Sequence, residues 1–264
     1  MEGRYRHVGK AEFKHHEYGH LNYADANAAL FYNHSFNEDN ALSWELEYDY
    51  LKVDWAENPR FRQTNFNYFG SSLGYVSTEI NKWRWIINTG FSVDTHHFNF
   101  GKTAVYHGML WGRYSFAEGA GVNMGVIGWY GVLNGYTLPI FGFDWFWGRH
   151  LKFNFIFPLN GSINYSFTPN WALELSYSGF GGPYKYPRRA SEGIGAYSNP
   201  IFKLYSSGMD LNLNYEYNHI LRASLGGGWN FGGWILIKDH NNHHGKYYKY
   251  NSAPYAQGSL ALSF

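Results

Sequence analysis

Alternation of apolar and polar residues with a period of two runs through this chain and predicts β-strands. The longest such run is 151–167, where every odd position is apolar or Gly. Its even positions are Lys152, Asn154, Ile156, Pro158, Asn160, Ser162, Asn164 and Ser166. An ordinary globular strand has about 5–6 residues, so this run is typical of a tilted strand that crosses a bilayer and continues beyond it. Because proline lacks an amide hydrogen, Pro158 predicts a bulge or bend there.

The C-terminal segment 258–264 shows the same alternation and ends on an aromatic residue. Leu260, Leu262 and Phe264 share one face, and small or polar residues occupy the other. Similar alternation recurs in 42–50, 82–88, 173–178, 209–217 and 221–225. A soluble sandwich would bury the apolar face, whereas a membrane barrel turns it to lipid and keeps the polar face for the lumen.

Composition separates these two classes of protein. Aromatic residues make up 21% of the chain, and such an excess suits the two aromatic girdles of a membrane barrel. Mean hydropathy is −0.44, and no run approaches the ~20 apolar residues of a membrane-spanning helix, which excludes a helical membrane protein. The absence of Cys fits folding in an oxidising compartment. Residues 1–4 contain no apolar export signal, so we interpret the chain as a mature or recombinant form.

Turn spacing predicts the number of strands. Short polar turns lie at 37–40, 79–82, 117–120, 168–170 and 218–220, and longer connections lie near 16–22, 56–65, 95–103, 134–150, 181–200 and 239–251. With residues 4–16 as the first strand and both termini on the side of the short turns, we expect twelve strands. The apolar segment 134–150 leaves an alternative of fourteen strands if it forms a further hairpin. It could also fold inward as a plug or lie on the outer leaflet.

Taken together, these features resemble the single-chain bacterial outer-membrane β-barrels that end in a C-terminal Phe. The resemblance covers nearly all of residues 4–264 and identifies no subfamily. It implies an all-β fold, a closed antiparallel transmembrane barrel of about 12 strands (alternative 14), with residues 1–264 as one domain in the bacterial outer membrane. The partners that it implies are outer-membrane lipid, lipopolysaccharide and the barrel-assembly machinery, which would recognise the C-terminal strand. A partner subunit is left open.

Charged residues on the polar faces would line the lumen of such a barrel. They are Arg4, Arg6, Lys10, Lys14, Glu45, Glu47, Asp49, Arg84, Arg113, Lys152, Glu174, Asp210, Glu216 and Arg222. Two interpretations fit: paired charges that fill a narrow lumen, or the opposed basic and acidic walls of a diffusion pore. We therefore expect a passive channel for small solutes. The alternative is a non-conducting structural or interaction barrel.

Histidines gather in two connections. The first holds His15, His16 and His20, and the last holds His240, His243 and His244. If the last strand pairs with the first, these connections are neighbours and could share a transition metal, which imidazole binds well. The alternative is a solvated loop. No other cofactor is expected, and a net charge of +1 without a basic block argues against nucleic acid.

Catalytic patterns are weak. In His34-Ser35 the two side chains would point to opposite faces of a strand, and Asp94-Thr95-His96 lacks an accompanying acidic pair. Basic residues mixed with Tyr at 60–62, 184–189 and 246–250 suit contact with lipopolysaccharide phosphates, or else capture of anionic sugars. An enzyme is thus the least favoured class.

Overall fold

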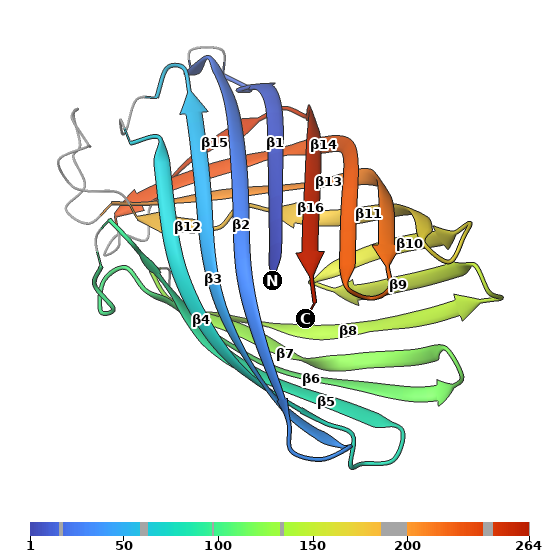
Figure 1. Cartoon of the computed structure of the whole chain (residues 1–264). Coiled ribbons are helices and arrows are strands. Elements are labelled where there is room, and N and C mark those ends of the chain that lie inside the picture. The colour runs from blue at the N-terminus through green and yellow to red at the C-terminus, as the bar shows by residue number, and fades with distance from the viewer. Residues whose placement is uncertain are drawn as a thin grey trace.

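The computed structural model describes residues 1–15, 18–58, 63–96, 98–132, 135–185, 200–239 and 245–263, which fold into a single antiparallel β-sheet (Figure 1). No helix in these ranges is long and apolar enough to cross a membrane. The strands are β1 (Glu2–Glu12), β2 (His20–Ser35), β3 (Asn40–Trp55), β4 (Asn65–Ser77), β5 (Trp83–Asp94), β6 (Val105–Ala117), β7 (Ala120–Gly131), β8 (Tyr136–Trp147), β9 (Leu151–Phe157), β10 (Asn160–Ser166), β11 (Trp171–Phe180), β12 (Pro183–Lys185), β13 (Pro200–Tyr217), β14 (Leu221–Asp239), β15 (Lys246–Tyr250) and β16 (Ala253–Leu262).

The sheet closes into a barrel of fourteen strands. Neighbours in sequence pair from β1 to β11, β11 pairs with β13, β13 with β14, β14 with β16, and β16 with β1. The remaining two strands, β12 and β15, are short and extend the wall beside β13 and β14. The expected closed antiparallel barrel is therefore confirmed. The preferred count of twelve strands is wrong and fourteen is correct, although 134–150 forms the single strand β8 rather than the expected hairpin, plug or outer-leaflet segment.

The two extra strands come from 134–167. The apolar segment supplies β8, and the long alternating run is a hairpin, β9 and β10, rather than one strand. Asn160 pairs with Ile156, so three residues, 157–159, lie between the paired positions. Pro158 lies in this turn. Because an odd number of residues separates the paired positions, odd and even residues keep their faces through the turn, and periodicity alone could not reveal the hairpin.

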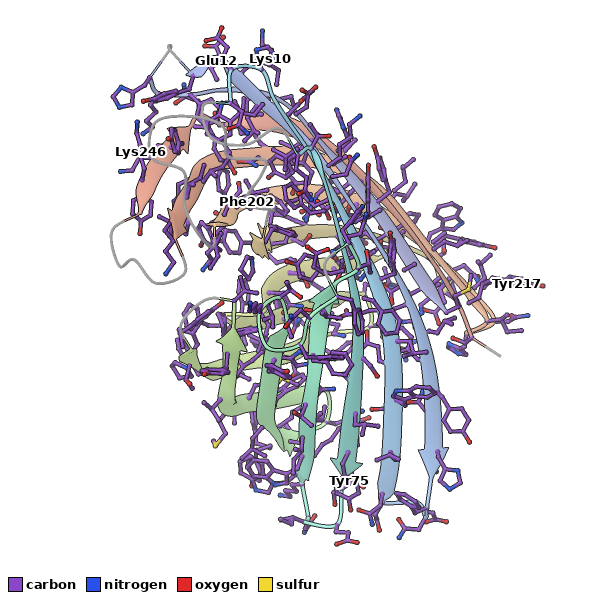
Figure 2. The ribbon with its side chains drawn as sticks, turned by 90° about the vertical axis from the view of Figure 1, so that its left-hand side faces the viewer. Lys10, Glu12, Tyr75, Phe202, Tyr217 and Lys246 are labelled. Carbon is purple, nitrogen blue, oxygen red and sulfur yellow. The ribbon has the colours of Figure 1, made fainter. Side chains whose placement is uncertain are left out.

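Large apolar side chains cover the outside of the barrel. Those exposed include Leu30, Trp44, Leu73, Ile87, Leu110, Val126, Phe143, Phe155, Leu175, Leu211, Leu225 and Leu260. Tyr217 projects away from the wall beside a short turn (Figure 2). A soluble monomer does not expose an apolar surface of this extent, whereas a barrel surrounded by lipid requires one.

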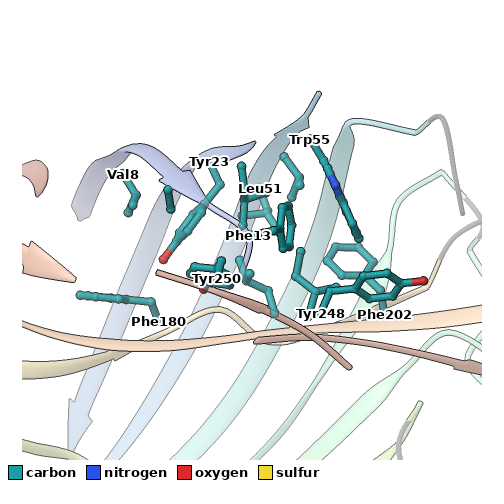
Figure 3. Packing of buried hydrophobic residues seen from close by; sticks show 14 of the residues in the cluster. Val8, Phe13, Tyr23, Leu51, Trp55, Phe180, Phe202, Tyr248 and Tyr250 are labelled. Atoms are coloured by element: carbon teal, nitrogen blue, oxygen red, sulfur yellow. The ribbon is translucent and has the colours of Figure 1, made fainter. Parts of the chain in front are cut away.

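The lumen is not open along its whole length. At the end opposite the termini, inward-facing residues of β1–β4 pack against those of β11 and β13–β16 (Figure 3). We call this cluster the apolar plug; its members are Val8, Ala11, Phe13, Leu21, Tyr23, Leu51, Val53, Trp55, Phe66, Phe180, Phe202, Leu204, Ile235, Ile237, Tyr248, Tyr250, Ala253 and Tyr255. The connection expected at 239–251 thus contributes β15, whose Tyr248 and Tyr250 are each 1% exposed.

Candidate functional site: the lumen and its cavities

A cavity of 700 Å³ occupies the half of the lumen nearer the termini. We call it the polar basin, because its lining is largely amide, hydroxyl and charged groups. These include Arg4, Arg6, Arg149, Lys152, Asn154, Asn160, Ser162, Asn164, Glu174, Ser176, Asn212, Asn214 and Gln257. The even positions of 151–167 therefore face the lumen, as their alternation predicts. A second cavity of 450 Å³, lined by Glu2, Glu216 and Arg222 among others, adjoins the basin toward the chain ends.

An ion pair separates the polar basin from the apolar plug. The Arg6 guanidinium donates to both carboxylate oxygens of Asp25 at 2.8 and 3.0 Å. It also lies 3.8 Å from the centre of the Phe180 ring, a plug residue. Arg6 is 4% exposed, so this charge is desolvated and needs both contacts. Arg4, whose guanidinium lies 3.8 Å from Asp25, remains 48% exposed in the basin.

A second buried carboxylate, Asp210, organises the opposite side of this boundary. It is 1% exposed and accepts hydrogen bonds from the Tyr255 hydroxyl at 2.5 Å, the Ser176 hydroxyl at 2.7 Å and the Gln257 amide at 2.7 Å. The Asn212 amide also donates to it. These donors come from β11, β13 and β16. The carboxylate is thus satisfied by the barrel wall and is not displayed to a solute.

The wall formed by β6–β8 holds a third charged network. Arg113 donates to both oxygens of Asp144 at 2.8 and 2.5 Å, and Asn123 donates to the same carboxylate at 3.1 Å. The Trp111 indole in turn donates to Asn123 at 3.0 Å. Sequence analysis missed Asp25 and Asp144, because 20–35 was not among the alternating segments and 134–150 was interpreted as a connection. Each lies two residues along its strand from another inward-facing position, Asp25 next to Asn27 and Asp144 next to Gly142, and this spacing of two could have predicted their inward direction.

The remaining residues expected in the lumen fall into two groups. Glu45, Glu47 and Asp49 lie on the inward face of β3, where Glu45 accepts from Ser72 at 3.1 Å and Asp49 from Asn27 at 2.8 Å. Arg84 pairs in register with inward-facing Arg113 on the next strand. Lys10 and Lys14 are instead exposed at the end of the barrel (Figure 2 labels Lys10). A register shift between Val8 and Ala11 reverses the faces of β1, so that Ala11 and Phe13 point inward.

The structure describes only part of the two connections in which the histidines gather. β16 does pair with β1, which was the condition for bringing the connections together. His16, His240, His243 and His244 lie outside the described residues. Of the other two, His15 packs its ring 6.2 Å from that of Tyr18, and His20 begins β2. The described ranges contain no cluster of three potential metal ligands.

Two further patterns have local roles. Asp94 accepts the His96 amide at 2.8 Å, a turn contact, and the His96 ring lies 3.3 Å from Asn67. Tyr248 and Tyr250, in the segment considered for capture of anionic sugars, cannot stack on a sugar, because both side chains are buried in the apolar plug. Residues 60–62 and 186–189 lie outside the described part of the chain.

A third cavity, of 380 Å³, opens beside the plug, and we call it the side cleft. Its lining is mostly apolar and comes from β6–β8 on one side and β11–β13 on the other. The residues are Val105, Trp129, Tyr130, Tyr136, Leu138, Gly179, Phe180, Gly181, Gly182, Pro183, Lys203, Leu204 and Tyr205. Gly179 lines both the side cleft and the polar basin, so the two cavities adjoin at that residue.

Strand pairing, the apolar outer face and the polar basin define a transmembrane β-barrel. No protein-family model matches the chain. An uncharacterized protein of Chlamydia trachomatis serovar D is 24% identical over 278 residues, which cover 100% of this chain and 86% of that protein. One of Chlamydia pneumoniae is 28% identical over 218 residues, 80% of this chain and 65% of that protein.

Solved barrels of the outer membrane resemble the chain in arrangement. A KdgM porin aligns with 100% of this chain and 99% of its own, at a TM-score of 0.37 and 13% identity. The toluene transporter TodX of Pseudomonas putida aligns with 100% of this chain and 89% of its own, at 0.43 and 9%.

Proposed function

We propose that this protein is a passive channel of the bacterial outer membrane for small solutes. Its path would run from the polar basin to the side cleft rather than along the barrel axis. The observation that carries the proposal is the meeting of the two cavities at Gly179. The axial route is filled by the apolar plug, whose larger residues, among them Phe13, Phe66 and Phe202, are 0–1% exposed.

Charge in the polar basin supports passage of small polar molecules. Lys152 has no ion-pair partner in the described part of the chain, and Arg4 remains half exposed after its contact with Asp25. Exposed cations at a water-filled entrance attract anions and raise their local concentration. The basin would therefore favour anionic over cationic solutes.

The second candidate is a non-conducting structural or interaction barrel. It is favoured by the packing of the apolar plug and by the Arg6–Asp25 pair, which together close the lumen between β1–β2 and β11. Under this alternative the basin would be a blind, water-filled pocket.

Single-channel recording in planar bilayers tests the proposal with one blocking variant and one matched control. At Gly179 an added Cβ meets only the Ser206 carbonyl oxygen, at 3.9 Å, so Gly179→Trp places a ring where the cavities meet. At Gly108, on the outer face of β6, an added Cβ meets nothing within 4 Å. We expect wild type and Gly108→Trp to conduct equally and Gly179→Trp to conduct less. A folded wild-type barrel without conductance above that of protein-free bilayers would favour the structural alternative.

Location and partners complete the proposal. The exposed apolar side chains would contact outer-membrane lipid, with the termini and short turns in the periplasm. Lys10 and Lys14, exposed at the opposite end, would contact lipopolysaccharide phosphates. β16, which closes the barrel against β1 and β14, would be the strand that the barrel-assembly machinery recognises.

A further inference from the structure

The barrel wall has a gap beside the side cleft. Among the described residues, β8 pairs with β9 only from Phe141 to Trp147, so 136–140 have no described partner strand on that side. In the same part of the structure β11 pairs with β10 only up to Tyr177, which leaves 178–180 without a described partner toward β8. The short β9–β10 hairpin borders the gap with its turn, 158–159, on the side nearer the chain termini. Pro139 lies within the unpaired part of β8, as expected where the ladder ends.

The cleft crosses this gap from the inside of the barrel to the outside. Trp129 and Leu138 line it from inward positions of β7 and β8, next to the cluster of Ile127, Ile140 and Ile156. Tyr205 lines it from an outward position of β13 and is 44% exposed. A cavity lined by both faces of the wall is open to the surroundings of the barrel. Tyr130 and Tyr205 are both exposed and give the mouth of the cleft an aromatic rim, so a molecule with an acyl chain can enter from the side.

The far edge of the gap is fixed by local backbone geometry. Gly181 has φ of +89°, and a Cβ there would lie 2.3 Å from the Leu204 carbonyl oxygen. Only glycine allows the chain to turn at this position and start β12, whose Pro183 pairs with Lys203. The gap is therefore built into the fold, because β12 continues along β13 instead of turning toward β8.

Lys203, which lines the cleft, and Lys238, which lies beside it on the neighbouring strand, mark it as a site for an anion. The Lys203 ammonium reaches across the gap to 5.2 Å from the Tyr136 ring centre and lies 5.6 Å from that of Trp234. Lys238 lies on the same face of the neighbouring strand, since Ile201 pairs with Lys238 and Lys203 with Leu236. Within the described ranges neither lysine has a carboxylate at ion-pair distance. Two adjacent cations without an acidic partner are stabilised by binding an anion.

We propose that the side cleft binds a single-chain anionic amphiphile, with its acyl chain among Trp129, Leu138 and Leu204 and its carboxylate at Lys203 and Lys238. A bound polar solute would leave the apolar lining uncompensated, so small polar solutes would pass the cleft without being held there, and a neutral apolar solute would leave the lysines unused. The site needs no conduction through the lumen, so binding and conductance are measured separately and either can fail alone.

Titration of the refolded protein with cis-parinaric acid, a fluorescent polyene fatty acid, tests the proposal against its neutral methyl ester. In nonionic detergent micelles we expect saturable binding of the acid, displaced by lauric acid, and about tenfold weaker binding of the ester, as for loss of a hydrogen bond to a charged group. Lys203→Met should lower the affinity for the acid by a similar factor and leave the affinity for the ester unchanged. Lys203→Arg, which keeps the charge, should retain most of the affinity.

Two further variants separate this site from the rest of the lumen. Lys152→Met removes the same charge from the polar basin and should leave the affinity for the acid unchanged. Leu138→Trp fills the cleft and should weaken acid and ester alike. Native folding of each variant is checked by the shift in gel mobility on heating, which folded barrels show. Equal affinities for acid and ester in the wild type, or an unchanged affinity in folded Lys203→Met, would overturn the proposal.

Discussion

Replacing Arg6 by Met should destabilise the barrel mainly by removing the two hydrogen bonds that Asp25 accepts from it, which leaves only the longer contact with Arg4. Arg6 is 4% exposed and Asp25 17%, so the pair is largely desolvated. Removing one member of a buried pair costs about 3–5 kcal/mol, and an exposed pair contributes about 0–1 kcal/mol. The remaining exposure of Asp25 places Arg6→Met between these ranges, at about 2–3 kcal/mol. A thioether can keep the contact with the Phe180 ring, so little of this loss comes from packing.

The double variant Arg6→Met, Asp25→Leu distinguishes a desolvated charge from lost packing. Because neither position then carries a charge, we expect its free energy of unfolding to lie within about 1 kcal/mol of wild type. Arg4→Met is the matched control, since Arg4 is 48% exposed and 3.8 Å from Asp25, and it should cost under about 0.5 kcal/mol.

Urea unfolding of the refolded barrel in detergent micelles, followed by tryptophan fluorescence, measures these differences once unfolding and refolding curves coincide. If the double variant lost as much free energy of unfolding as Arg6→Met and Asp25→Leu lose together, the two residues would not be energetically coupled. A wild-type stability for Arg6→Met would show that water reaches the site freely. Either result would refute the assignment of Arg6 and Asp25 as the boundary between the polar basin and the apolar plug.

Three further variants test other parts of the barrel by the same unfolding assay. Phe202→Ala should cost about 3–5 kcal/mol, because the side chain is 0% exposed in the apolar plug. Leu211→Arg should cost about 2–4 kcal/mol, because the side chain faces lipid and is 50% exposed, whereas Asn214→Arg on the lumen face of the same strand should cost much less; equal losses would contradict the assigned faces. Tyr255→Phe should cost about 1–3 kcal/mol by removing one donor from buried Asp210, and no loss would mean that the other donors suffice.

The sequence predicted the lipid-facing surface correctly because alternation is a local property. Phe155 and Phe157 are exposed on the outside, at 42% and 50%, as their odd positions require. Lys152 and Asn154 line the polar basin from the even positions. A side chain's face depends only on its place in its own strand, so no tertiary information was needed.

Alternation could not give the strand count or the turns inside a continuous pattern. The run 151–167 keeps its period through the β9–β10 turn because Asn160 pairs with Ile156. Conversely, the register shift between Val8 and Ala11 breaks the period in β1 without ending the strand, and it moves Lys10 out of the lumen. A tight turn and a bulge each involve only a residue or two. The composition of such a segment therefore does not show whether the strand ends there or continues with its faces exchanged.

What the sequence alone determined is the class of structure. Its strands cross lipid with one apolar face outward, and they pair antiparallel in a closed sheet because backbone groups need partners in lipid. What only the tertiary structure decided is the content of the lumen. Tyr23, Phe202 and Tyr250 lie far apart in the chain. They meet in the apolar plug because the inward face of β2 opposes those of β13 and β15, which flank β14. Which side chains oppose across a lumen depends on closure, register and strand tilt together, and these are properties of the whole sheet.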